Sequence, residues 1–275
     1  MVRMRFATAT LCLAGLALAA APSADIFRPS KEDQVKLGQR ASESIRKEEK
    51  ILPDTHPRVL FLRRVANKVL DAIPAKEREK EIWKFSFDVI DSKDVNAFAR
   101  PGGPIYFFNG LIDKMETEDQ LAGVLAHEIT HIRNQHWASS YADTMKRRMG
   151  LTLVLTLLNA NDTMFSVAGV ADELIFNLPY SRKHETESDR VGFDLVVKAG
   201  YNPRGLADMM RVFAKEGGKT PEFVSTHPEP GKRADAIERR AGELKVAVPE
   251  QRPLPANVRQ SANGQGVKAG TKGGR

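Results

Sequence analysis

His127, Glu128 and His131 have the types and the spacing of a metal-dependent hydrolase. In the pattern H-E-x-x-H on a helix, the two histidines lie one turn apart and can hold a single zinc ion. Zinc lowers the pKa of a bound water to about 7, and the neighbouring carboxylate can take its proton and later return it to a leaving amine. The alternative is a chance match on an ordinary surface helix, because the pattern also produces false positives.

The residues around this pattern are typical of a helix over 117–137. Thr117 and Gln120 form a capping box, followed by apolar residues at helical spacing. The members of this apolar stripe are Leu121, Leu125, Ile129 and Ile132. The stripe predicts one buried face, with the two histidines on the other side and Glu128 at the border between them.

A later helix, predicted over 184–199, offers a third ligand. A hydrolytic zinc site usually has three protein ligands and one open position, and the first helix supplies only two ligands. Glu185 fits the third place, Asp189 could accept the outer N–H of a ligating histidine, and Gly192 would let the helices approach closely. The alternative is that Glu185 and Asp189 belong to a solvated acidic face. The spacing excludes a metzincin, whose motif requires a different set of residues after the second histidine.

Three short segments before the motif helix predict a small sheet. Residues 83–89 alternate between apolar and polar, and the segments 95–99 and 105–108 follow on either side of a Pro-Gly-Gly-Pro turn. An exposed edge of such a sheet can bind an extended peptide as an added strand. The alternative is that residues 96–103 form only a hairpin. Helical patterns predict scaffold helices over 30–48, 57–73, 203–215 and 231–245, and two buried or lid-like helices over 149–158 and 164–178.

The two ends of the chain differ in charge and composition from the residues between them. The 275 residues carry a formal net charge of +7, but the excess lies mostly near the two ends, which argues against a nucleic-acid partner. Residues 1–24 predict a cleavable signal peptide, with two arginines, a short apolar run and small residues. The single cysteine, Cys12, lies in this segment, so disulfides and thiolate ligands are excluded from the mature protein. We then expect residues 25–248 to form one metal-binding domain, with the motifs of a metallopeptidase, and residues 249–275 to form a disordered basic tail.

Three motifs together resemble a known family. They are Asn-Ala-Phe-Ala-Arg-Pro-Gly-Gly at 96–103, His-Glu-Ile-Thr-His at 127–131 and Leu-Pro-Tyr-Ser-Arg-Lys-His-Glu-Thr-Glu-Ser-Asp-Arg-Val-Gly at 178–192. In this order they resemble the zinc endopeptidases of the HtpX, CAAX prenyl protease, mitochondrial Oma and periplasmic BepA family, and the resemblance covers about residues 30–245.

The resemblance implies a role for each matching position. It implies that His127, His131 and Glu185 bind zinc, that Glu128 is the base and that Asp189 supports a ligand. It places substrate along the sheet edge, at Asn96, Ala97, Phe98, Ala99, Gly102 and Gly103. Arg100 departs from the apolar residue that family members often have there, so the substrate preference at this edge stays open.

Of the remaining four histidines, one is a candidate for a role in the reaction. His227 lies in a late His-Pro loop of a kind that recurs in the family, and could stabilise an oxyanion or occupy the open zinc position as a reversible plug. The alternative is a loop histidine without a role. His136 is predicted to turn away from the metal face at a helix end, while His56 and His184 are predicted to lie on the surface.

We therefore predict an α+β, mainly helical, zincin-like domain that acts as a periplasmic or otherwise exported zinc endopeptidase with one zinc ion per chain. Its expected partners are unfolded or misassembled envelope polypeptides, with peripheral membrane contact as an open alternative and no nucleic acid. A second hypothesis is an envelope chaperone or binding module whose zinc site is held closed by His227 and is rarely active.

Overall fold

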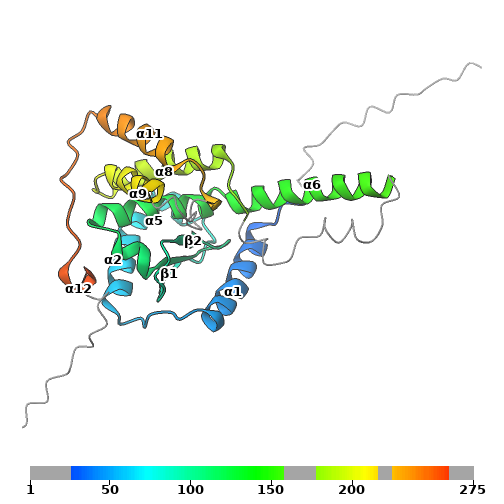
Figure 1. Cartoon of the computed structure of the whole chain (residues 1–275), viewed down its shortest axis with the longest axis horizontal. Helices are drawn as coiled ribbons and strands as arrows, with labels where there is room; N and C mark the ends of the chain where they lie inside the picture. The colour runs from blue at the N-terminus through cyan, green and yellow to red at the C-terminus, as the bar shows by residue number, and fades with distance from the viewer. Residues whose placement is uncertain (1–25, 158–177, 216–224, 260–275) are drawn as a thin grey trace, which may run out of the picture.

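Helix α5, Glu118–Arg133, runs through the centre of the molecule and carries the H-E-x-x-H residues. The computed structural model describes residues 26–157, 178–215 and 225–259. As predicted, Thr117 and Gln120 form a capping box at the start of α5. Figure 1 shows α5 between the small sheet on one side and helices α8 (Arg182–Lys198) and α9 (Arg204–Lys215) on the other.

The prediction of a single buried face on α5 is wrong. Every residue from Glu118 to Ile132 is buried, including both histidines. The sheet and helix α2 (Pro57–Asp71) cover the apolar stripe, while α8 and α9 cover the polar side. The sequence pattern of α5 shows which face is apolar, but it does not show that the polar face is covered by other polar groups.

The sheet has three strands, in the order β1-β3-β2. Strand β1 (Ser86–Ile90) pairs in parallel with β3 (Pro104–Phe108), and β2 (Ala97–Ala99) pairs with β3 in antiparallel fashion. Strands β2 and β3 thus form a hairpin, and β2 is an outer strand of the sheet. The turn needs Gly102, because its φ is +83° and a Cβ there would lie 2.4 Å from the Cα of Val35.

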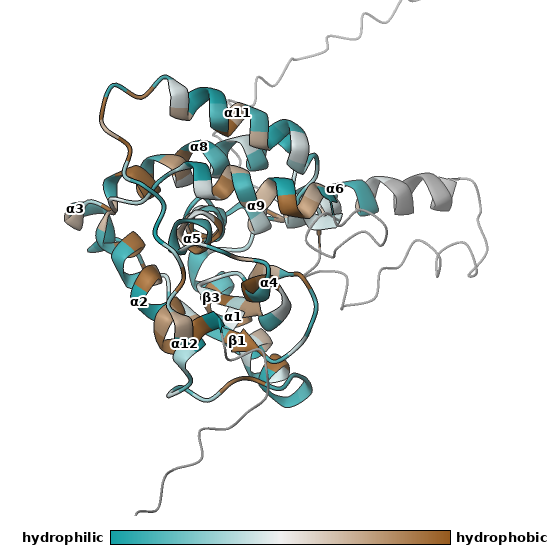
Figure 2. Ribbon diagram, turned by 60° about the vertical axis from the view of Figure 1, so that its left-hand side comes forward, coloured by the Kyte–Doolittle hydropathy of each residue, from teal (hydrophilic) through white to brown (hydrophobic). Residues whose placement is uncertain are grey.

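The two faces of the sheet meet different helices. One face joins the main core, with α2 and α5, and the other packs on α1 (Lys31–Glu48) through Ile45, Tyr106 and Phe108. Ser30 caps α1, as the sequence predicts. Figure 2 shows that the outer helix α11 (Pro230–Gly242) is mostly hydrophilic, in keeping with its surface position. The other described helices are α3 (Ala75–Arg78), α4 (Asn109–Asp113), α6 (His136–Leu157) and α12 (Ala256–Arg259).

The predicted disorder of the tail is wrong for residues 249–259. Leu254 and Val258, two of the few large apolar residues in this segment, are buried, and Val258 accepts a hydrogen bond from the Nε of Arg58 at 3.0 Å. Helix α12 packs against α2. Two apolar anchors and several backbone hydrogen bonds are enough to hold a segment whose composition suggests disorder.

Several predicted segments fall outside the part of the chain that the structure describes. These are residues 1–24, most of the predicted helix over 164–178, and residues 260–275. The apolar run from residue 149 continues α6, which extends away from the domain in Figure 1. Within the described ranges, none of the helices has both the length and the apolar character needed to cross a bilayer.

Candidate metal centre

Four buried side chains from three parts of the chain meet beside α5. His127 and His131 come from α5, Glu185 from the first turn of α8, and His227 from the segment that leads into α11. One nitrogen or oxygen atom of each lies within 4.8 Å of the others. Each of the four residues is at most 2% exposed. The structure thus brings together the three predicted ligands and the late histidine.

The distances among these atoms fit a tetrahedral metal ion. Zinc bonds of about 2.0–2.1 Å place neighbouring tetrahedral ligand atoms about 3.3 Å apart. His127 Nε2 lies 3.0 Å from His131 Nε2 and 3.6 Å from Glu185 Oε2, while His131 Nε2 lies 3.4 Å from Glu185 Oε1. Two imidazoles and one carboxylate are also a donor set that zinc commonly takes. The residues present therefore fit a zinc ion.

Close packing of α8 on α5 brings Glu185 to the histidines. Gly192 faces the backbone of α5, where an added Cβ would lie 3.2 Å from Ala126 and His127. The predicted close approach at Gly192 is thus confirmed. Ser181 caps α8, its side chain accepting a hydrogen bond from the backbone N–H of His184 at 3.2 Å, which places Glu185 in the first turn.

Asp189 and Arg233 form a charged layer behind the metal-binding atoms. Asp189 Oδ1 lies 3.0 Å from His127 Nδ1, the position expected for an acceptor of the outer N–H. Arg233 donates to both Asp189 oxygens at 2.7 Å and forms an ion pair with Glu185. Burial would raise the pKa of Glu185, but His227 and Arg233 outweigh it and hold that pKa well below its ordinary value. Glu185 is therefore a carboxylate at neutral pH, ready to bind a cation.

Glu128 is buried next to this group, and neither of its carboxylate oxygens is hydrogen-bonded to a described residue. The residue is 1% exposed. Burial raises the pKa of Glu128, although His227 and His127 oppose the shift. A buried carboxylate without hydrogen bonds costs stability unless a further donor approaches it. A water molecule or a reacting group is the natural partner, and the raised pKa suits a proton carrier.

The sequence model of peptidase family M48 matches residues 61–241, which include the whole centre. The chain belongs to peptidase family M48. Relatives of this chain are named metalloendopeptidase and protease.

The relatives are longer proteins. The mitochondrial metalloendopeptidase OMA1 of Schizosaccharomyces pombe is 31% identical over 226 residues, which cover 79% of this chain and 64% of the relative. The β-barrel assembly-enhancing protease of Yersinia pestis is 30% identical over 172 residues, or 58% of this chain and 35% of the relative. The OMA1 metalloendopeptidase of Bos taurus is 32% identical over 163 residues, or 55% and 31%. The chain thus spans less than two thirds of each of these relatives.

In this M48 peptidase, His227 takes up the remaining corner of the metal-binding group. Its Nδ1 lies 3.3 Å from His127 Nε2 and 3.1 Å from Glu185 Oε1, and its Nε2 lies 3.6 Å from Glu128 Oε1. Burial lowers the pKa of His227, but Glu185 and Glu128 outweigh burial and raise it. The ring can therefore act as a metal ligand or as a cation between two carboxylates.

The other three histidines are all more buried than the sequence predicts. His136 is 2% exposed, and its Nδ1 lies 3.1 Å from His131 Nδ1. His184 is half-buried and stacks on the His136 ring, with centroids 4.5 Å apart. His56 is also half-buried, at the start of α2, where its Nδ1 caps the helix by accepting a hydrogen bond from the Arg58 N–H.

Sequence reasoning assigned no role to Arg233 or Tyr180. The sequence predicts only that Arg233 lies in a scaffold helix over 231–245. No local pattern distinguishes it from the other arginines of α11. Tyr180 belongs to the third motif, and its ring centroid lies 3.8 Å from that of His131. Burial and the nearby Glu128 and Glu185 raise the pKa of Tyr180, so its phenol stays protonated. Its position in a motif just before a ligand was the available signal.

The predicted substrate segment lies beside α5. Strand β2 contains Ala97, Phe98 and Ala99, and packs against α5. Asn96 is buried just before the strand, with its C=O accepting a hydrogen bond from Phe108 N–H at 3.0 Å, and Gly102 and Gly103 form the turn. Phe98 turns to the α1 side of the sheet, where it packs against Tyr106. The substrate-binding role of this segment stays a prediction.

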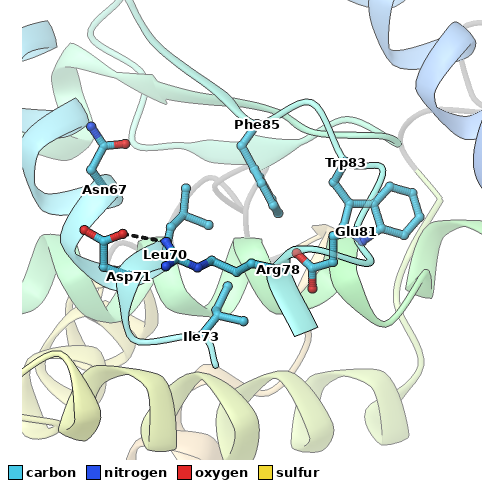
Figure 3. A pocket seen from close by; sticks show the side chains of 8 residues that line it. All are labelled: Asn67, Leu70, Asp71, Ile73, Arg78, Glu81, Trp83 and Phe85. Atoms are coloured by element: carbon cyan, nitrogen blue, oxygen red, sulfur yellow. Dashed lines mark hydrogen bonds and ion pairs between the residues drawn. The ribbon is translucent and has the colours of Figure 1, made fainter. Parts of the chain in front are cut away.

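A cavity of about 440 Å³ lies elsewhere, between α2, α3 and the segment that leads into β1. Figure 3 shows its lining, in which Arg78 pairs with Asp71 and the aromatic rings of Trp83 and Phe85 form one wall. The lining contains no histidine and none of the metal-binding residues. Its acidic side chains are held by arginines, since Glu81 pairs with Arg133. The cavity therefore does not bear on the peptidase chemistry.

Proposed function

We propose that this protein is a zinc-dependent endopeptidase. His127, His131 and Glu185 hold the metal, and Glu128 acts as the general base. Bound zinc would supply Lewis-acid polarisation of the scissile carbonyl and of the attacking water. The single observation that carries the proposal is the meeting of these three ligands beside the buried carboxylate of Glu128, which has no hydrogen-bond partner among the described residues.

Residues of the chain transfer the proton, position a ligand and bind the substrate. Glu128 takes a proton from the attacking water and returns it to the leaving amine, a role that suits its raised pKa. Asp189 holds the His127 ring through its Nδ1, and Arg233 holds Asp189 in turn. An extended peptide pairs with the outer edge of β2, which places its backbone alongside α5.

Substitution of Glu128 tests whether the protein is a peptidase that uses Glu128 as its general base. Casein or a fluorogenic peptide is incubated with the purified zinc-loaded protein, and we expect Glu128→Gln to lower kcat by about 10²–10⁴-fold. The zinc content should stay that of the parent, because Glu128 is not among the ligands. Glu79→Gln, on the surface after α3, is the matched control and should keep full activity. A fully active Glu128→Gln protein would remove Glu128 from the mechanism.

We further propose that the substrates are unfolded or misassembled exported polypeptides. Two observations support this class: the signal-like sequence of residues 1–24, and relatives named β-barrel assembly-enhancing proteases. An open strand edge also selects for extended chains, since a folded substrate cannot add a strand. Cleavage of a reduced, unfolded protein but not of its native form would support the proposal, and equal cleavage of both would contradict it.

The position of His227 favours a second candidate, a binding module or chaperone whose zinc site is plugged. Its Nδ1 lies where a fourth ligand would bind. If the ring is a plug, His227→Ala should raise peptidase activity and leave zinc bound. If the ring instead stabilises the oxyanion, the same variant should lower kcat by about 10²–10³-fold. A protein that binds unfolded chains with zinc and cleaves none, with or without His227, would establish the second candidate.

A further inference from the structure

His131 has a buried partner on the side of its ring that faces away from the metal-binding group. Its Nε2 points to that group, 3.4 Å from Glu185 Oε1. Its Nδ1 lies 3.1 Å from Nδ1 of His136, the first residue of α6. The other histidine of the motif has a comparable partner, because His127 Nδ1 lies 3.0 Å from Asp189 Oδ1. Each motif histidine therefore has its outer nitrogen paired.

The protons of the two rings can be assigned by elimination. A metal-binding Nε2 carries no proton, so the neutral His131 ring has its proton on Nδ1. A hydrogen bond between two Nδ1 atoms needs one donor and one acceptor. His136 is therefore the acceptor, and its own proton is on Nε2, which lies 3.4 Å from Glu187 Oε2. The hydrogen bond thus runs from the His131 Nδ1–H to His136 Nδ1, and Glu187 lies on the other side of the His136 ring.

The His136 ring is held on several sides. The residue is 2% exposed, and Ser188 Oγ lies 3.2 Å from its Nδ1. The His184 ring stacks on it with an interplanar angle of 11°. Asn134 donates to Glu187 at 2.8 Å, which fixes the carboxylate that faces Nε2. A ring packed in this way can impose an orientation on the ring beside it.

A break between α5 and α6 makes the contact feasible. Five residues further along a continuous helix, His136 would point about 140° away from His131. Helix α5 ends at Arg133, and Gln135 has a φ of +56°, a left-handed conformation that is uncommon for a residue with a side chain. Gln34 of α1 donates to the Gln135 side chain at 3.1 Å and holds this turn. The turn redirects the chain so that His136 faces back toward His131.

We propose that His136 is a positioning residue that accepts the Nδ1 proton of His131 and thereby holds its Nε2 in the form and direction needed for metal binding. The proposal rests on the proposed function, because it assumes that His131 binds the metal. Outer partners of ligating histidines typically contribute 10–100-fold to metal affinity. His136 would thus support His131 as Asp189 supports His127.

The test compares two amides at the same position. The Oδ1 of His136→Asn can take the place of the imidazole Nδ1, whereas His136→Gln carries its oxygen near the Nε2 position and leaves His131 without an acceptor. Zinc affinity is measured by chelator competition. We expect the Asn variant to bind zinc within a few-fold of the parent protein and the Gln variant to bind it about 10–100-fold more weakly. His184→Leu is the matched control, since it removes the stacking neighbour but no contact to a ligand nitrogen.

Two further readouts separate positioning from general stability. Thermal unfolding of the zinc-free Asn and Gln variants should give similar Tm values, so that a difference in affinity is not a folding defect. Nitrogen-15 NMR of the zinc-loaded parent should show a protonated Nδ1 on His131 and an unprotonated Nδ1 on His136.

Equal zinc affinity of the Asn and Gln variants, or a protonated Nδ1 on His136, would overturn the inference. A parent protein that binds no zinc would instead refute the proposed function, so the two failures are distinguishable.

Discussion

Arg233 is the residue on which the charge balance of the metal centre depends. It is 8% exposed and lies between Asp189 and Glu185. Burial lowers the pKa of Arg233, but the two carboxylates outweigh burial and raise it, so the guanidinium stays charged. A planar guanidinium can bond both oxygens of Asp189 and still reach Glu185, which a lysine cannot do.

We expect Arg233→Met to destabilise the zinc-free protein by about 3–5 kcal/mol, because it leaves two buried carboxylates without their cation. Urea unfolding at pH 7 measures the loss. The matched control is Arg240→Met, two turns further along α11, where the pair with Asp194 is partly exposed and should contribute no more than about 1 kcal/mol. Equal effects of the two substitutions would show that Arg233 has no special role.

Glu118 links stability to pH at the start of α5. Arg64 donates to both of its oxygens, at 3.0 and 2.9 Å, and the Tyr201 hydroxyl donates at 2.6 Å. Burial raises the pKa of Glu118, but these bonds outweigh burial and hold the pKa below 4.5. A carboxylate with a lowered folded-state pKa stabilises the protein above its unfolded-state pKa and loses that contribution as the pH falls.

We therefore expect the stability difference between the parent and Glu118→Gln to be fully present above about pH 5 and to shrink as the pH falls from 4.5 through the lower pKa of the folded protein. Because Arg64 is half exposed, the difference at pH 7 should be on the order of 1 kcal/mol. Urea unfolding between pH 7 and pH 3 measures it. A difference that does not change with pH would mean that the charge of Glu118 does not contribute.

At the scale of elements, glycines set the distance between α5 and the helices that cover it. A Cβ on Gly123 of α5 would lie 2.8 Å from Leu206 Cβ and N, at the start of α9. A Cβ on Gly192 of α8 would be tight against the α5 backbone at His127. Helices that approach so closely leave little freedom for the side chains between them, which is how two histidines and a glutamate from different helices keep a fixed separation.

We expect Gly123→Ala to destabilise the protein by about 1–3 kcal/mol, because α9 must move away from α5. Gly150→Ala, in the projecting part of α6, meets no atom within 4 Å and should be neutral or stabilising by up to about 1 kcal/mol. Thermal and urea unfolding of both variants measure the contrast. If Gly123→Ala is as well tolerated as Gly150→Ala, the helices are not in the close contact described.

At the scale of the whole molecule, the segment 249–259 contacts both α2 and the start of α5. The backbone N–H of Arg252 donates to Asp119 at 2.7 Å, and that of Leu254 donates to Glu116 at 2.9 Å. Further along the segment, the backbone C=O of Val258 accepts a hydrogen bond from the buried side chain of Arg58. These contacts brace the start of α5, the helix that carries the metal-binding histidines.

We expect truncation after residue 248 to destabilise the protein by at least about 3 kcal/mol, since it removes two buried apolar side chains worth about 1.5–3 kcal/mol each. Truncation after residue 259 keeps every one of these contacts and serves as the control. Urea unfolding of the two shortened proteins measures the difference. Equal stabilities would mean that the segment does not contribute to the domain.

The elements and much of the metal centre could be predicted from local sequence patterns. Capping residues and helical spacing identify α1, α2, α5 and α8, because these signals lie within one or two turns of the chain. The sequence predicts that His127, His131 and Glu185 are metal ligands, and the structure brings the three side chains together. The substrate edge and the zinc itself stay predictions.

The sequence could not reveal contacts that depend on the direction of the chain in space. His136 meets His131 only because the chain turns at Gln135, and helical spacing alone predicts the opposite. Arg233 reaches Glu185 and Asp189 from a helix more than 40 residues further along the chain, and nothing in its local sequence distinguishes it. Leu254 and Val258 are buried because a surface is present to receive them, which composition does not record. Local patterns thus specify the helices and the ligand types, whereas the packing of distant segments determines which polar groups are buried against one another.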